Sequence, residues 1–72
     1  MSTDQSARLS GTVTQFDEFI GLGEITDDKR RVWPFHCVSI ADGTRTIAVG
    51  AHVSFLPAFR VARSEAVSII PA

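Results

Sequence analysis

The chain has 72 residues, a formal net charge of −1 and a 44% hydrophobic fraction, which together predict one small globular domain. The near-neutral charge does not by itself indicate a nucleic-acid-binding protein, and the hydrophobic fraction excludes a disordered tail. No apolar run is long enough to span a membrane, residues 1–7 lack the apolar core of a secretory signal, and the single cysteine excludes an internal disulfide, so we expect a cytoplasmic protein.

The first half of the chain has the pattern of strands separated by turns. Residues 1–7 are small and polar and predict a flexible lead-in to a domain over residues 8–72. From Leu9 onward apolar and polar residues alternate, and this period of two predicts a first strand. Residues 22–26 predict a second strand, and the charged residues 26–31 predict the turn that follows it.

The second half continues the same pattern. Residues 32–40 are β-branched and aromatic and predict a third strand, in which Pro34 needs an edge or an unpaired position because it has no N–H group. A turn or long loop begins at residues 41–44, and residues 50–57 and 66–70 predict the fourth and fifth strands. Short strands at this spacing, with no helix, favour a small all-β barrel, because closure removes exposed sheet edges.

The expected core follows from the alternation. Trp33 and Phe35 share one face of the third strand, and Pro34 and His36 share the other, outer face. Trp33 is interpreted as a core residue, with a displaced stacking platform as the alternative. The residues expected to fill the barrel are Val13, Ile25, Trp33, Phe35, Ile40, Val53, Phe55 and Ile69.

Several residues are of types found in phosphate-binding, metal or catalytic sites, but together they do not match the pattern of any such site. Gly21 and Gly23 lack the third glycine and the following helix of a phosphate-binding loop. His36 and Cys37 are neighbours on a predicted strand and therefore point to opposite faces; with His52 they fall short of the four ligands of a tetrahedral zinc site. We therefore predict no enzyme, no metal site and no cofactor.

Four segments resemble the bacterial cold-shock proteins. "GTVTQFDEFIGLGEI" (11–25) resembles the family's opening G-x-V-K-W-F-N and K-G-F-G-F-I, and "VWPFHCVSI" (32–40) resembles its V-F-V-H-F-S-x-I. "DGTRTIAVGAHVSF" (42–55) is similar to its loop and fourth strand, and "RSEAVSI" (63–69) to its closing G-P-Q-A-x-x-V. The resemblance implies a divergent member with a five-stranded antiparallel OB-type barrel.

The same resemblance implies a changed binding face. In the family, bases of a single strand stack on aromatic side chains of the first three strands, and lysines hold the phosphates. The residues at the aromatic positions here are Gln15, Leu22, Glu24, Pro34, Cys37 and, on or near the loop position, Thr44. Two lysine positions hold Thr14 and Ile20. Because each base–aromatic stack contributes roughly 1–3 kcal/mol, most of the family's affinity is expected to be lost.

Two functions follow from this resemblance as hypotheses. The first is weak or altered binding of single-stranded RNA or DNA by a set of retained aromatic and basic residues, namely Phe16, His36, Lys29, Arg30, Arg31 and Arg45. The alternative interpretation of the bases at 29–31 is a solvated turn balanced by Asp27 and Asp28. The second function is a protein-interaction module that has lost nucleic-acid binding, with an apolar patch formed by Leu22, Pro34, Cys37, Phe19 and Ile20.

Overall fold

The computed structural model describes residues 8–41, 43–60 and 63–71, and these form five antiparallel strands in one sheet. The strands and the one short helical turn are β1 (Leu9–Asp17), β2 (Leu22–Asp27), β3 (Val32–His36), η2 (Cys37–Ser39), β4 (His52–Arg60) and β5 (Arg63–Pro71). Their order in the sheet is β3-β2-β1-β4-β5. The predicted OB-type barrel is thus confirmed, whereas the predicted lead-in over residues 1–7 lies outside the described residues.

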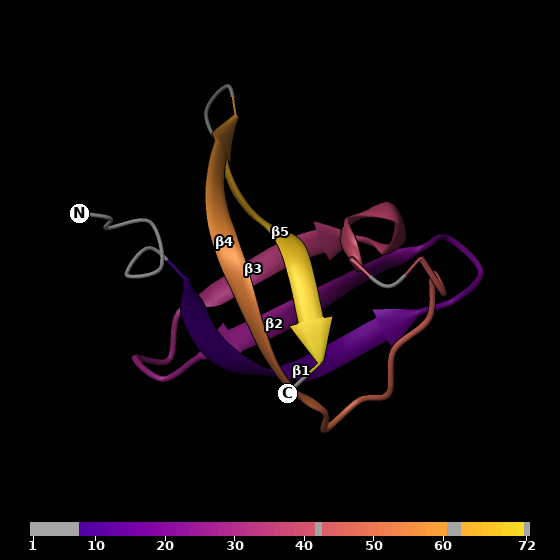
Figure 1. The fold of residues 1–72 in the computed structure, drawn as a ribbon, viewed down its shortest axis with the longest axis horizontal. Helices are drawn as coiled ribbons and strands as arrows, with labels where there is room; N and C mark the ends of the chain where they lie inside the picture. Colours follow the sequence, from indigo (N-terminus) through magenta and orange to yellow (C-terminus); the bar gives the residue numbers. More distant parts are fainter. Residues whose placement is uncertain (1–7, 42, 61–62, 72) are drawn as a thin grey trace.

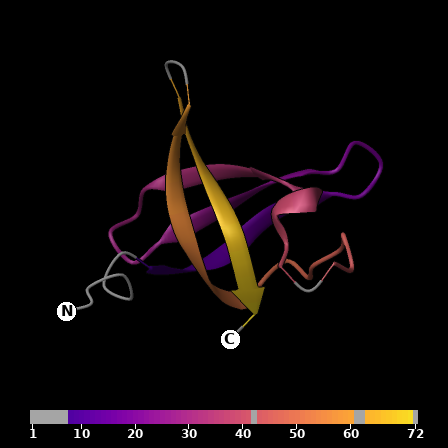
Figure 2. The ribbon, with the colours of Figure 1, turned by 45° about the horizontal axis from the view of Figure 1, so that its top comes forward.

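The sheet closes through a contact between the segment after β3 and the last strand. Ile40 forms a parallel bridge with Ile69, and the Ala41 N–H group donates to the Ile69 carbonyl oxygen at 2.8 Å. Figures 1 and 2 show the β4–β5 hairpin crossing the three strands β1, β2 and β3 and extending beyond them. The described residues include no helix long and apolar enough to cross a membrane.

The barrel interior holds the residues that the alternation predicted. All eight expected core residues are buried, and Ala66 is buried with them. Trp33 is 6% exposed and its ring lies 5.7 Å from that of Phe55, so its interpretation as a core residue is confirmed and the alternative of a stacking platform is wrong. Burial of these side chains supplies the main stabilisation available to so short a chain.

The third strand is shorter than predicted. β3 ends at His36, because the Cys37 N–H group donates to the Gly21 carbonyl oxygen and the Ile40 N–H group donates to the Cys37 carbonyl oxygen, which closes η2. The prediction of one strand over residues 32–40 is therefore wrong for its last four residues, 37–40. Cys37 lies on a helical turn, not on a strand face opposite His36.

The last two strands are longer than predicted, because Pro57 does not end β4. β4 continues past this proline to Arg60, and β5 begins at Arg63. Proline usually ends an interior strand because it lacks a donor. Here β1 pairs with β4 only as far as Phe55, so Pro57 stands where β4 has one neighbour, β5. Pro34 is tolerated for the same reason, since β3 is at the end of the sheet order, as predicted.

The two glycines of residues 20–25 have different structural roles. Gly21 belongs to the β1–β2 turn and has a φ of 69°, a conformation that disfavours other residues. Gly23 lies within β2, where a Cβ atom would be 2.6 Å from the Gln15 carbonyl oxygen and 2.6 Å from the Phe35 ring. The absent side chain at Gly23 therefore makes room for the Phe35 ring over the sheet.

Candidate functional site

Two rows of paired residues cross the outer face of β1, β2 and β3. The first row is Gln15, Glu24 and Pro34, and the second is Asp17, Leu22 and His36. These residues alternate with Ile25, Trp33 and Phe35, which are buried, so their side chains point to the outside of the barrel. The sequence prediction that Pro34 and His36 share the outer face is confirmed.

A bulge in β1 sets this arrangement. The register shifts between Val13 and Gln15, which leaves Thr14 as an extra residue and brings Gln15 opposite Glu24. The Thr14 hydroxyl donates to the Glu24 carbonyl oxygen at 3.3 Å and lies 3.2 Å from the Thr26 hydroxyl. The bulge therefore aligns the substituted aromatic positions on all three strands in one row.

A surface groove of about 880 Å³ lies over these rows. Its lining includes the side chains of both rows, together with Val49 from the loop before β4 and Glu65 from β5. Four of the lining residues are carboxylates, namely Asp17, Glu18, Glu24 and Glu65. The described residues that line it include no lysine or arginine, so its carboxylates oppose the approach of a phosphate group. The uncharged bases of a nucleic acid are not repelled in this way.

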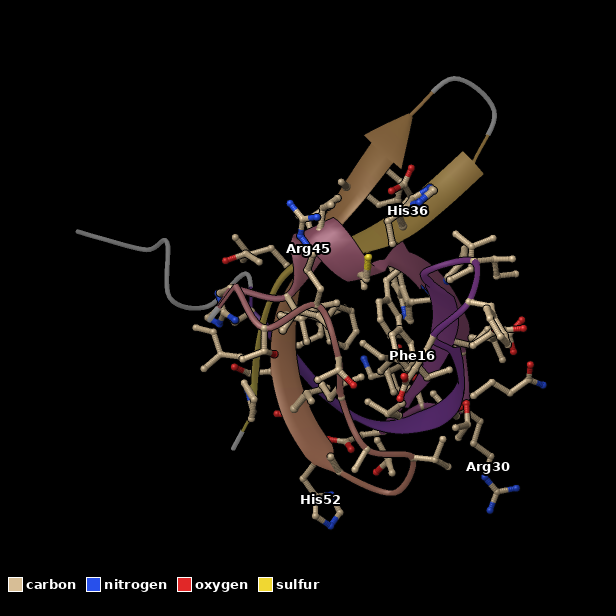
Figure 3. The ribbon with its side chains drawn as sticks, turned by 90° about the vertical axis from the view of Figure 1, so that its right-hand side faces the viewer. Phe16, Arg30, His36, Arg45 and His52 are labelled. Atoms are coloured by element: carbon tan, nitrogen blue, oxygen red, sulfur yellow. The ribbon has the colours of Figure 1, made fainter. Side chains whose placement is uncertain are left out.

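The two retained aromatic positions both line this groove, but they differ in access. His36 is exposed at the end of β3, whereas Phe16 is half-buried and its ring stacks on Phe35 with a centroid distance of 5.9 Å and an interplanar angle of 1°. Figure 3 shows His36 at the outside of the barrel end and Phe16 further in. His36 is thus the free aromatic platform of the groove, and Phe16 forms part of its floor.

The predicted basic residues lie elsewhere. Lys29 and Arg31 line a second, smaller hollow beside Trp33, at the opposite end of β2 from the groove. Arg30 and Arg45 are exposed, have φ angles of 67° and 60°, and line neither hollow. Arg30 belongs to the turn between β2 and β3 and Arg45 to the segment between η2 and β4, and Figure 3 draws the two on opposite sides of the barrel. The six predicted site residues therefore do not form one cluster.

Asp27 organises the turn that carries the bases. One of its carboxylate oxygens accepts from the Lys29 and Arg31 N–H groups at 2.8 and 2.9 Å, and the other accepts from the Trp33 indole N–H at 3.0 Å. The indole hydrogen bond, followed by those from the backbone of Arg31 and Lys29, lowers the pKa of Asp27 despite a smaller opposing effect of burial. The Asp27 carboxylate thus connects the turn to the core through Trp33.

Arg8 is a basic residue of the second hollow that the sequence analysis did not single out. Its guanidinium donates to the Ser54 hydroxyl at 3.1 Å and to the Ser68 carbonyl oxygen at 2.7 Å. These bonds connect the segment before β1 to β4 and β5. Arg8 is therefore a structural cross-link between strands.

The predicted apolar patch is present in part. Phe19 is 99% exposed and Ile20 is 64% exposed in the β1–β2 turn, and Leu22 follows them at 41%. Pro34 is exposed beside them in the groove, whereas Cys37 is half-buried and packs against the core cluster. Cys37 is thus more buried than the patch prediction implied. This position, which is aromatic in the resembled family, does not lie on the outer face of β3 here.

Sequence reasoning missed the acidic character of the groove. Glu18, on the β1–β2 turn, and Glu65, on β5, both line it. The contribution of Glu65 depends on the extension of the β4–β5 hairpin beyond Pro57, which the composition of residues 58–65 does not signal.

Comparison with known proteins supports the fold. No protein-family model matches the chain, and no curated protein sequence matches it. Among solved structures, the chain is similar to the structure of Drosophila Unr CSD456, with a TM-score of 0.76 and 26% sequence identity over 90% of this chain. The chain spans 26% of the length of that structure. The barrel therefore has the fold of a cold-shock domain.

Proposed function

We propose that this protein binds single-stranded nucleic acid on the outer face of β1, β2 and β3, with lower affinity than a face with a full set of aromatic side chains. The observation that carries the proposal is that Phe16 and His36, 20 positions apart in the sequence, line the same groove on a barrel with the cold-shock-domain fold. A base stacked on the exposed His36 ring would lie over this groove.

The composition of the groove accounts for the low affinity. One exposed imidazole and one half-buried phenyl ring supply fewer stacking surfaces than the resembled family, and each lost stack costs roughly 1–3 kcal/mol. The carboxylates of the groove also oppose close approach of the phosphates. Phosphates are therefore expected at the rim, and the basic side chains of the turn at residues 27–31, between β2 and β3, are candidates to contact them.

The test is the affinity for mixed-sequence single-stranded RNA and DNA at low salt. We expect His36→Ala to weaken binding by about tenfold, the loss of one stacked base. His52→Ala is the matched control, because His52 is the other exposed imidazole; its ring lies 3.3 Å from the Thr12 hydroxyl and outside the groove. Equal affinities of the two variants, or no binding by the native chain at high micromolar oligonucleotide, would contradict the proposal.

A second candidate function is protein binding, and one observation favours it. Phe19 and Ile20 of the β1–β2 turn and Leu22 at the start of β2 are exposed apolar residues close together in the sequence, and Ile20 and Leu22 line the groove. A partner with apolar and basic side chains would complement this surface. Leu22→Asp would then abolish partner capture or self-association, whereas Val32→Asp, at the other end of the three strands and 55% exposed, would not.

A further inference from the structure

Glu24 occupies the centre of the proposed binding face. It pairs with Gln15 on one side and Pro34 on the other, so it is the middle member of a row across three strands. Its side chain is half-buried and lines the groove. Within the part of the chain that the structure describes, the Glu24 carboxylate makes no side-chain hydrogen bond, so both of its oxygens remain able to accept from a ligand in the groove.

A base stacked on β3 would bring its edge to Glu24. Pro34 is directly opposite Glu24, and His36 is its diagonal neighbour on the same face. Cβ atoms of directly opposite residues are about 5 Å apart and those of diagonal neighbours about 7 Å apart, which is within the reach of a glutamate side chain and of a base edge. A base that stacks on His36 with its hydrogen-bonding edge toward β2 would place that edge within reach of the Glu24 carboxylate.

A carboxylate discriminates between bases by their donors. Guanine offers an N–H and an amino group side by side, which match two carboxylate oxygens, and cytosine offers an amino group. Uracil and thymine offer one N–H flanked by two carbonyl oxygens, which a carboxylate repels. We propose that Glu24 makes this face select bases with exposed amino groups, guanine above all, over uracil and thymine. This inference rests on the proposed function.

Gln15 supports the same selection. Its amide is exposed beside Glu24 on β1 and also lines the groove. An amide both donates and accepts hydrogen bonds, so it can bond to the remaining polar groups on the edge of a purine that reaches across β2. Glu24 supplies the discrimination, because an acceptor-only group penalises carbonyl edges and an amide does not.

The test compares the hexamers UGUGUG, UCUCUC and UUUUUU in low salt by fluorescence anisotropy. We expect the native chain to bind UGUGUG at least about fivefold more tightly than UUUUUU, the lower range of discrimination by a bidentate contact, with UCUCUC between them. Glu24→Gln keeps the size of the side chain and should reduce this ratio to near one. It should also tighten binding of UUUUUU, because a repulsive charge is removed.

The matched control is Glu18→Gln, which removes the same charge from the groove at the β1–β2 turn, outside the two rows. It should tighten binding of all three hexamers while leaving their ratio unchanged. A native ratio near one, or a ratio that survives Glu24→Gln, would overturn the inference but leave the proposed function intact. Binding of none of the hexamers would overturn the proposed function and the inference together.

Discussion

The groove and the turn at residues 27–31 lie at opposite ends of β2 and have opposite character. The groove combines the exposed His36 ring with four carboxylates, whereas the turn presents Lys29, Arg30 and Arg31 and holds them in place through Asp27. Among the side chains that the structure describes, the stacking groups of the groove and the cations of the turn, which a single-strand-binding face usually interleaves, are therefore separated. The separation predicts binding dominated by base contacts, with a small dependence on salt.

A second contrast separates the inner and outer faces of the same three strands. Phe35 is 1% exposed and packs among Phe16, Gly23 and the core, whereas Leu22 is 41% exposed. Phe35→Ala should cost about 3–5 kcal/mol, which is enough to unfold a domain with so small a core. Leu22→Ala should change the free energy of unfolding by no more than about 0.5 kcal/mol.

Urea denaturation of the two variants checks this contrast between faces. Because Phe16 rests on Phe35, a partly folded Phe35→Ala chain should also lose the groove floor. A tolerated Phe35→Ala, or a strongly destabilising Leu22→Ala, would show that the assignment of inner and outer residues is wrong.

The stability that Asp27 gives to the turn at residues 27–31 is expected to depend on pH. Replacement by Asn should cost about 1–2 kcal/mol at pH 7, because the charged acceptor of two N–H groups and the Trp33 indole becomes neutral. The folded-state pKa of Asp27 lies below its ordinary value of 3.8, so its contribution is fully present above that value. As the pH falls from there through the folded-state pKa, the contribution is lost.

Thermal unfolding of the native chain and Asp27→Asn, measured from pH 7 down to pH 2, tests this expectation. The stability difference between the two chains should shrink below about pH 4. A difference that stays constant over this range would mean that the carboxylate charge does not stabilise the turn.

The smallest expected effect concerns the basic residues. Lys29→Gln keeps the backbone N–H that bonds to Asp27 and removes only the side-chain charge. If a phosphate reaches the turn, the slope of log affinity against log salt should fall by about 0.7, with a modest loss of affinity at low salt. The matched variant Arg45→Gln, between η2 and β4 and lining neither hollow, should leave the slope unchanged; an equal change in both variants would indicate unspecific attraction.

The sequence predicted the interior of this molecule better than its exterior. Alternation identified Trp33, Phe35 and the other core residues because burial imposes a period of two on each strand. The outer positions of Pro34 and His36 followed from the same rule. The groove was less predictable, because Val49 and Glu65 reach it from segments whose placement depends on the long loop and on the extent of the β4–β5 pairing.

Local hydrogen bonds explain why β3 is shorter than the sequence predicted. The bond from the Cys37 N–H to Gly21 ends β3 and begins η2, and no property of residues 37–40 themselves distinguishes this turn from a continued strand. Likewise, the sequence placed Lys29 and Arg31 with Phe16 and His36 in one site. The antiparallel register instead places the turn at the far end of β2.

Amide chemical shifts during titration with UGUGUG at low salt test the central claim most directly. The largest changes are expected on the outer-face rows of β2 and β3, at Leu22, Glu24 and His36, with small changes at residues 27–31. Changes confined to residues 27–31, or no changes at high micromolar oligonucleotide, would contradict it.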